Sequence, residues 1–194
     1  MTLILAALIG GSAAFGQSPS SEDITVTASR LRSECSRVVN AGSASEAEAV
    51  CRRAVDVANQ LPRDAVLERS GARAWLGHAL LFQRKSKEAL EQYTQELELV
   101  QSVLKPTEAE VASAYRHLAM AHFLLGDSPR ADQELGRAVS IMEAAIINLP
   151  SEKLRYQEQL RTILGERAQV KRQLGDEVAA AALEKRAKEL AVVP

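Results

Sequence analysis

Aromatic residues, histidine and net charge are all scarce in this chain of 194 residues. Only 4% of the residues are aromatic while 46% are hydrophobic, so a core must be built mainly from Ala, Leu and Val, which suits closely packed helices. The net charge of −1 provides no long-range field that would attract nucleic acid, and we expect no nucleic-acid partner. Length and composition are those of a single globular domain.

The sequence also lacks the short motifs that carry catalytic chemistry. It contains no H-E-x-x-H, no G-x-S-x-G and no phosphate-binding glycine loop. His117 and His122 are five positions apart, which places them on different sides of a helix and makes them poor joint metal ligands. Acidic pairs such as Glu96 and Glu98 are typical of solvated helix faces. We therefore predict that the protein is not an enzyme and that it holds no cofactor or metal.

An apolar segment opens the chain. Residues 1–16 (MTLILAALIGGSAAFG) end in small residues and are typical of a secretory signal peptide cleaved before Gln17, although no Lys or Arg precedes the apolar run. An uncleaved membrane anchor is the alternative interpretation; after cleavage we expect no membrane association. The segment thus predicts a periplasmic or secreted bacterial protein.

Cysteine occurs only twice, as Cys35 and Cys51. An even number of cysteines in an exported chain favours a structural disulfide. A metal site is disfavoured because no histidine lies near them in the sequence, and a redox pair is disfavoured because the C-x-x-C spacing is absent.

From about residue 31 onward, apolar residues recur at steps of three and four, which predicts about eight helices in antiparallel pairs over residues 31–194. Gly42, Gly126 and Gly175 lie at predicted turns, and each is followed by alanine five and twelve positions later. Arg84 stands at the equivalent turn of the second pair. Glycine there ends the first helix of a hairpin, and the two alanines let the helices approach closely. Such hairpins leave an apolar face uncovered, so they must stack into a solenoid.

This pattern resembles the tetratricopeptide repeat (TPR) family in its long-repeat form, over roughly residues 28–191. The third unit carries the resemblance best, at Tyr115, Leu118, Ala119, Gly126, Ala131, Leu135 and Ala138. The resemblance implies an all-α, right-handed superhelical solenoid of about four antiparallel helix hairpins. Its register also places Cys35 and Cys51 at facing positions within the first hairpin.

In TPR proteins the first helix of each hairpin lines a concave groove that holds an extended peptide or a partner helix. Carried over to this chain, the resemblance implies a partner groove lined by His78, Phe82, Arg116, Met120, Phe123, Gln169 and Arg172. The implied function is a non-catalytic scaffold with a protein or peptide partner. For the two phenylalanines, packing between repeat units is the alternative. An oligomeric assembly subunit, pairing through the Ala/Leu face of residues 177–191, is an alternative function.

One stretch departs from the helical pattern. Residues 17–30 are interpreted as a flexible leader that contains a strand-like ribbon of alternating polar and apolar residues. The ribbon consists of Asp23, Ile24, Thr25, Val26, Thr27 and Ala28. It resembles the TonB box of TonB-dependent outer-membrane receptors, which adds as a strand to TonB. The resemblance implies a further alternative, an accessory component of outer-membrane uptake that engages TonB through residues 22–29. A chance match and docking in a groove of this or a neighbouring molecule also remain open.

Overall fold

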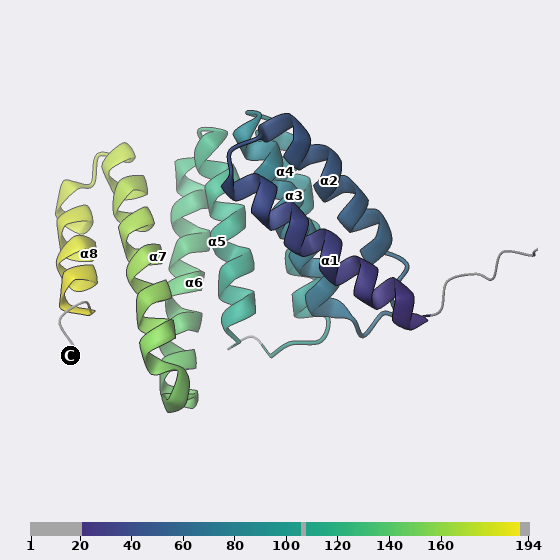
Figure 1. Ribbon diagram of the computed structural model, residues 1–194. Helices are drawn as coiled ribbons and strands as arrows, with labels where there is room; N and C mark the ends of the chain where they lie inside the picture. Colours follow the sequence, from purple (N-terminus) through teal and green to yellow (C-terminus); the bar gives the residue numbers. More distant parts are fainter. Residues whose placement is uncertain (1–20, 106–107, 191–194) are drawn as a thin grey trace, which may run out of the picture.

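The computed structural model describes residues 21–105 and 108–190, and this part of the chain is all-helical (Figure 1). The predicted signal peptide, residues 1–16, lies outside the described residues. The helices are α1 (Ser21–Asn40), α2 (Ala44–Ala58), α3 (Val66–Phe82), α4 (Ser86–Gln101), α5 (Ala109–Leu124), α6 (Ser128–Asn148), the short 3₁₀-helix η1 (Pro150–Glu152), α7 (Lys153–Gln173) and α8 (Glu177–Leu190).

Consecutive helices pair into four hairpins that stack in one row, α1/α2, α3/α4, α5/α6 and α7/α8 (Figure 1). The second helix of each hairpin packs against the first helix of the next, and α1 additionally packs against α3. Within the described residues each hairpin contacts only its neighbours, which defines a solenoid. The predicted solenoid of four helix hairpins is confirmed.

The hairpin turns follow the predicted repeat. Gly42, Gly126 and Gly175 have φ angles of +79°, +83° and +78°, and Arg84 adopts the same left-handed conformation with φ +60°. Five of the six alanines at the +5 and +12 positions are completely buried; these are Ala47, Ala54, Ala131, Ala138 and Ala180. The sixth, Ala187, is partly buried in the last helix, which has no hairpin beyond it among the described residues.

The prediction of a flexible, strand-like leader is wrong for residues 21–30, which form the first turns of α1. The reason is a helical apolar stripe that begins inside the ribbon. Ala28 and Leu31 are each only 2% exposed, and Ile24 packs against the same core. The β-branched residues suggest a strand locally, but burial of this stripe against neighbouring helices stabilises the helix instead.

The predicted disulfide is present. Cys35 of α1 is bonded to Cys51 of α2, with their Cα atoms 4.9 Å apart. Both side chains are fully buried, so the bond joins the two helices of the first hairpin inside the core. Among the described helices, none is at once long and apolar enough to cross a membrane.

Candidate partner groove

The C-terminal ends of α1, α3 and α5 surround a groove of about 480 Å³. Its lining residues, which define "the groove" below, are Val39, Asn40, Trp75, His78, Leu81, Phe82, Arg116, Met120 and Leu124. Asn40, Phe82 and Leu124 are the last residues of their helices and are spaced by 42 residues, so they occupy equivalent repeat positions. Phe82 and Leu124 are 60% and 54% exposed, which leaves large apolar side chains beside an open groove.

A smaller hollow of about 150 Å³ lies on the other side of Met120, between α5, α6 and α7. It includes Phe123 and Leu135 on its apolar side and Glu166 and Gln169 on its polar side. Met120 lines both hollows, so they adjoin each other at this flexible side chain.

Six of the seven residues predicted for the groove line one of these two hollows. The groove is lined by His78, Phe82, Arg116 and Met120, and the smaller hollow is lined by Met120, Phe123 and Gln169. Arg172 lines neither hollow, because its guanidinium forms ion pairs with Glu177 and Glu184 of α8.

The sequence predicts no groove residue from α1, yet Val39 and Asn40 form one wall. Asn40 lies 42 residues before Phe82, which is one repeat length. The repeat length therefore indicates that Asn40 occupies the equivalent groove position. Trp75 of α3 is a partly buried lining residue.

The polar side of the groove is built on a buried tyrosine. Tyr93 of α4 is fully buried, and its hydroxyl is hydrogen-bonded to His78 Nδ1 at 2.9 Å. This arrangement requires Gly77, because a Cβ atom at that position would lie 2.3 Å from the Tyr93 ring. Burial, with smaller effects from the charges of His117 and Arg116, lowers the pKa of His78 to about 3, so the groove presents a neutral imidazole near neutral pH.

A second buried pair lies next to the first. His117 Nδ1 is 2.9 and 3.0 Å from the two carboxylate oxygens of Glu96, and the ring of His117 stacks on Tyr93 with centroids 5.2 Å apart. The Glu96 side chain is only 7% exposed, so its assignment to a solvated face is wrong. The buried carboxylate thus has a hydrogen-bond partner in His117. Glu98, by contrast, is exposed as expected.

Arg116 is held in place by a carboxylate from the next hairpin. Its guanidinium donates to both carboxylate oxygens of Glu166 on α7, with Nε to Oε2 at 2.7 Å. These hydrogen bonds raise the pKa of Arg116 despite its partial burial. An acidic partner must therefore compete with Glu166 for Arg116, and the uncommitted surface of the groove is mainly apolar.

No metal-binding chemistry is evident at this site. Across residues 21–105 and 108–190, no three His, Cys, Asp or Glu side chains are grouped so that they could hold a metal ion. What the geometry offers is an apolar groove with a neutral histidine and a neutralised arginine.

The sequence comparison agrees with this fold in part of the chain. A tetratricopeptide repeat family model matches residues 71–144, which extend from α3 into α6. No curated protein matches the chain.

Solved structures extend the likeness over most of the chain. The apo form of RapI superposes with a TM-score of 0.71 at 14% identity, covering 87% of this chain and 44% of that one. A Rap protein complexed with Competence and Sporulation Factor gives 0.73 at 16% identity, covering 88% and 44%. A TPR-like protein from Chlorobium tepidum TLS gives 0.58 at 25% identity, covering 77% and 98%. This chain thus spans 44% of the length of each of these Rap chains, and it is a TPR-like helical-repeat protein.

Proposed function

We propose that the protein is a non-catalytic scaffold whose groove binds an apolar face of a protein or peptide partner. The observation that carries this proposal is the pair of exposed side chains, Phe82 and Leu124, at equivalent repeat positions beside the groove. Covering such side chains is favourable by roughly 25 cal/mol for each Å² of apolar surface removed from water. The complex of a Rap protein with Competence and Sporulation Factor supports this use of the fold.

The chemistry of the groove indicates the kind of segment that fits. His78 is neutral, and Arg116 is paired with Glu166, so the groove provides little uncompensated charge. Asn40 and His78 add polar groups at its edge. An amphipathic segment, with large apolar residues toward Phe82 and Leu124, satisfies both features.

Site-specific crosslinking tests the groove directly. A photoreactive amino acid at Leu81 identifies the partner and its contact segment in the native cell. Phe82→Ser combined with Leu124→Ser should remove at least nine-tenths of that partner's binding in solution. Leu154→Ser changes a side chain that is 70% exposed at the opposite end of a hairpin and serves as the matched control. Retained binding by the double variant, with its helical content unchanged, would exclude the groove as the binding surface.

We also propose that the scaffold works in the periplasm or outside the cell. The apolar residues 1–16 and the Cys35–Cys51 disulfide support this location. Mass spectrometry of the protein from separated cell fractions, without reductant, should show a chain that begins at Gln17 and lacks two hydrogens. A cytosolic chain with residues 1–16 retained and free thiols would contradict the proposal.

Engagement of TonB through residues 22–29 is a separate proposal, supported by the resemblance of the ribbon to a TonB box. Because these residues are helical, strand addition would require the first turns of α1 to unfold. Val26→Ala offers a clean test, since alanine favours the helix and disfavours a strand at this exposed position. The variant should bind a periplasmic TonB domain more weakly than the parent; equal binding would exclude strand addition by this segment.

A further inference from the structure

Two arginines differ from every other half-buried cation in the described residues. The five other half-buried lysines and arginines each have a carboxylate oxygen at 2.5–2.8 Å. These are Arg32, Lys85, Arg116, Arg167 and Lys171. Arg69 and Arg73 of α3 are half-buried as well, but neither forms an ion pair with a carboxylate of the described residues. A half-buried charge without a counter-charge is unfavourable, so the site is one that an anion would stabilise.

The two side chains lie four residues apart and therefore on one face of α3. Arg73 reaches only neutral acceptors, with Nη1 3.2 Å from Gln92 Oε1 and Nη2 3.1 Å from Asn59 Oδ1. The buried Nε atom of Arg69 has no hydrogen-bond partner among residues 21–105 and 108–190. Burial, together with the charge of Arg69, lowers the pKa of Arg73. The pair is therefore placed to donate to a shared oxyanion.

Space for a ligand exists beside Arg73. A hollow of about 470 Å³ is lined by Arg73 of α3 and by Gln95, Glu98, Leu99 and Ser102 at the C-terminal end of α4 and just beyond it. This arginine hollow faces away from the groove. Because Arg73 and His78 are five residues apart, they point about 140° apart around α3. Glu98 is an exposed carboxylate on the wall of the hollow and would repel an incoming anion.

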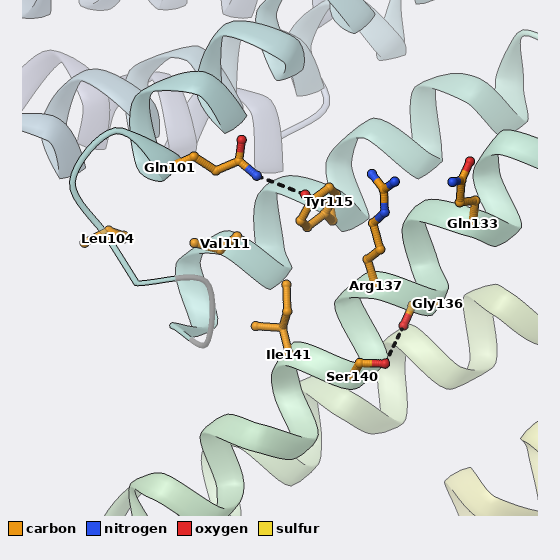
Figure 2. A pocket seen from close by; sticks show the side chains of 9 residues that line it. All are labelled: Gln101, Leu104, Val111, Tyr115, Gln133, Gly136, Arg137, Ser140 and Ile141. Atoms are coloured by element: carbon orange, nitrogen blue, oxygen red, sulfur yellow. Dashed lines mark hydrogen bonds between the residues drawn. The ribbon is translucent and has the colours of Figure 1, made fainter.

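A second, apolar hollow of about 580 Å³ lies one repeat further along the same face. Figure 2 shows its lining, with Tyr115 of α5 between Gln101 of α4 and Arg137 of α6. Gln101 donates to the Tyr115 hydroxyl at 2.9 Å, and the Arg137 guanidinium lies 5.4 Å from the ring centroid. Leu104, Val111 and Ile141 also contribute apolar surface. Tyr115 occupies the repeat position that Arg73 occupies in the preceding unit, 42 residues earlier.

The end of α4 separates the two hollows. Gln101 lines the apolar hollow while the next residue, Ser102, lines the arginine hollow. A helix with its side chains is about 10 Å wide, a distance that about three residues of extended chain span. A free small anion would fill the arginine hollow only, whereas a peptide fills both.

We propose that these two hollows form a second docking site, which binds an extended segment of a partner protein. The segment places an Asp or Glu carboxylate between Arg69 and Arg73 and, three residues along the chain, a large apolar side chain against Val111, Tyr115 and Ile141. The site lies on the opposite side of α3 from the groove and does not depend on the function proposed for the groove.

Backbone amide shifts of the ¹⁵N-labelled chain test this proposal, because they detect weak binding and locate it. The probe is the peptide acetyl-Ser-Glu-Ser-Ser-Leu-Ser-amide, compared with the same peptide carrying Gln in place of Glu. The Glu peptide should shift the amides of residues 69–73, 98–102 and 111–115 in a saturable manner, with an affinity at least tenfold above that of the Gln peptide. Arg73→Gln should abolish the difference between the peptides, and Glu98→Gln should increase the affinity for the Glu peptide at least threefold.

Two variants serve as controls. Arg130→Gln removes an exposed arginine at the start of α6 and should leave peptide binding unchanged. Phe82→Ser alters the groove and should also leave it unchanged, so failure of one site is distinguishable from failure of the other. If Arg73→Gln loses its native spectrum, Arg69→Met replaces it, because methionine keeps the apolar part of the side chain.

The proposal is overturned by equal affinity for the two peptides. It is also overturned if inorganic phosphate shifts residues 69–73 but the Glu peptide does not, since the hollow would then be a small-anion site. Shifts confined to the groove residues would overturn it as well.

Discussion

Arg84 is the residue that departs from the repeat at its most restrictive position. Its turn has the same pattern of backbone hydrogen bonds as the turn at Gly126. The Lys85 N–H donates to the Leu80 carbonyl at 2.9 Å, and the Asp127 N–H donates to the His122 carbonyl at the same distance. The geometry is that of a Schellman motif, which places the residue after the helix in the left-handed region. At φ +60° the Cβ atom of Arg84 adds steric strain that glycine avoids.

We expect Arg84→Gly to increase the free energy of unfolding by about 0.5–1 kcal/mol, since the relief of strain exceeds the added flexibility of the unfolded chain. Urea denaturation measures the change. Gly126→Ala provides the converse control and should lose about 1 kcal/mol. No atom lies within 4 Å of a Cβ atom at Gly126, so that loss reports the backbone conformation alone. A less stable Arg84→Gly protein would mean that contacts of the arginine side chain outweigh the strain.

The buried imidazole of His78 predicts a dependence of stability on pH. Its pKa is lowered from 6.5 to about 3 in the folded protein, mainly by burial. Between these values the unfolded chain binds a proton that the folded protein does not, so the free energy of unfolding decreases as the pH falls from 6.5 toward 3. The contribution of one group is at most about 1.4 kcal/mol per pH unit. His78→Gln should show a shallower decrease in urea denaturation between pH 7 and pH 4. An identical pH profile for parent and variant would contradict the assignment.

At the scale of elements, α1 depends on the disulfide as well as on packing. The Cys35–Cys51 bond closes a loop with a sequence separation of 16 residues. Cross-linking a loop of this size stabilises a protein by about 3 kcal/mol through the entropy of the unfolded chain. We expect the Cys35→Ala, Cys51→Ala double variant to lose about this amount in urea denaturation. The parent with its thiols reduced is the control that separates the bond from the change of side chain. Equal stability of all three proteins would show that packing alone fixes the first hairpin.

The helices and turns could be predicted because their signals are local. Gly126 and Ala131 lie in one hairpin, and their spacing reflects a single turn. The start of α1 could not be predicted in this way. The burial of Ala28 depends on helices that come later in the chain, and this burial overrides the strand preference of its neighbours. Local strand propensity contributes less free energy than burial in the core, and the first turns of α1 are therefore helical.

The sequence predicts the position of a groove residue but not its side-chain partner on another helix. The repeat register carried over from the TPR resemblance predicts Phe82 and Met120 in the groove, because backbone position determines where these side chains point. Arg116 and Glu166 are 50 residues apart, and no local pattern pairs them. The same register predicts Arg172 in the groove, but a carboxylate on α8 binds its guanidinium.

The whole molecule is asymmetric, because its two end hairpins are secured differently. The first helix, α1, packs against both α2 and α3 and carries the disulfide. Among the described residues of α8, only Ala180 is buried, and its backbone packs against α7 alone. Ion pairs of Arg172 with Glu177 and Glu184 and of Arg186 with Glu143 also hold α8, but partly exposed pairs of this kind contribute only about 0–1 kcal/mol each. In a solenoid, a terminal helix with one neighbour opens first.

Native-state hydrogen exchange should therefore show the fastest exchange of helical amides in α8, slower exchange in α1, and the slowest in α5 and α6. Reducing the disulfide should accelerate amide exchange in α1 and leave exchange in α8 unchanged, because the hairpins between them separate the two ends.

The same experiment tests the oligomeric alternative, in which α8 pairs with a second copy. In that case the protection of Leu183 and Ala187 would increase with protein concentration, whereas exchange of a monomeric scaffold is independent of it. Protection of α8 equal to that of α5 at the lowest concentration would contradict the asymmetry itself, since the described part of α8 buries one alanine whereas α5 buries seven residues.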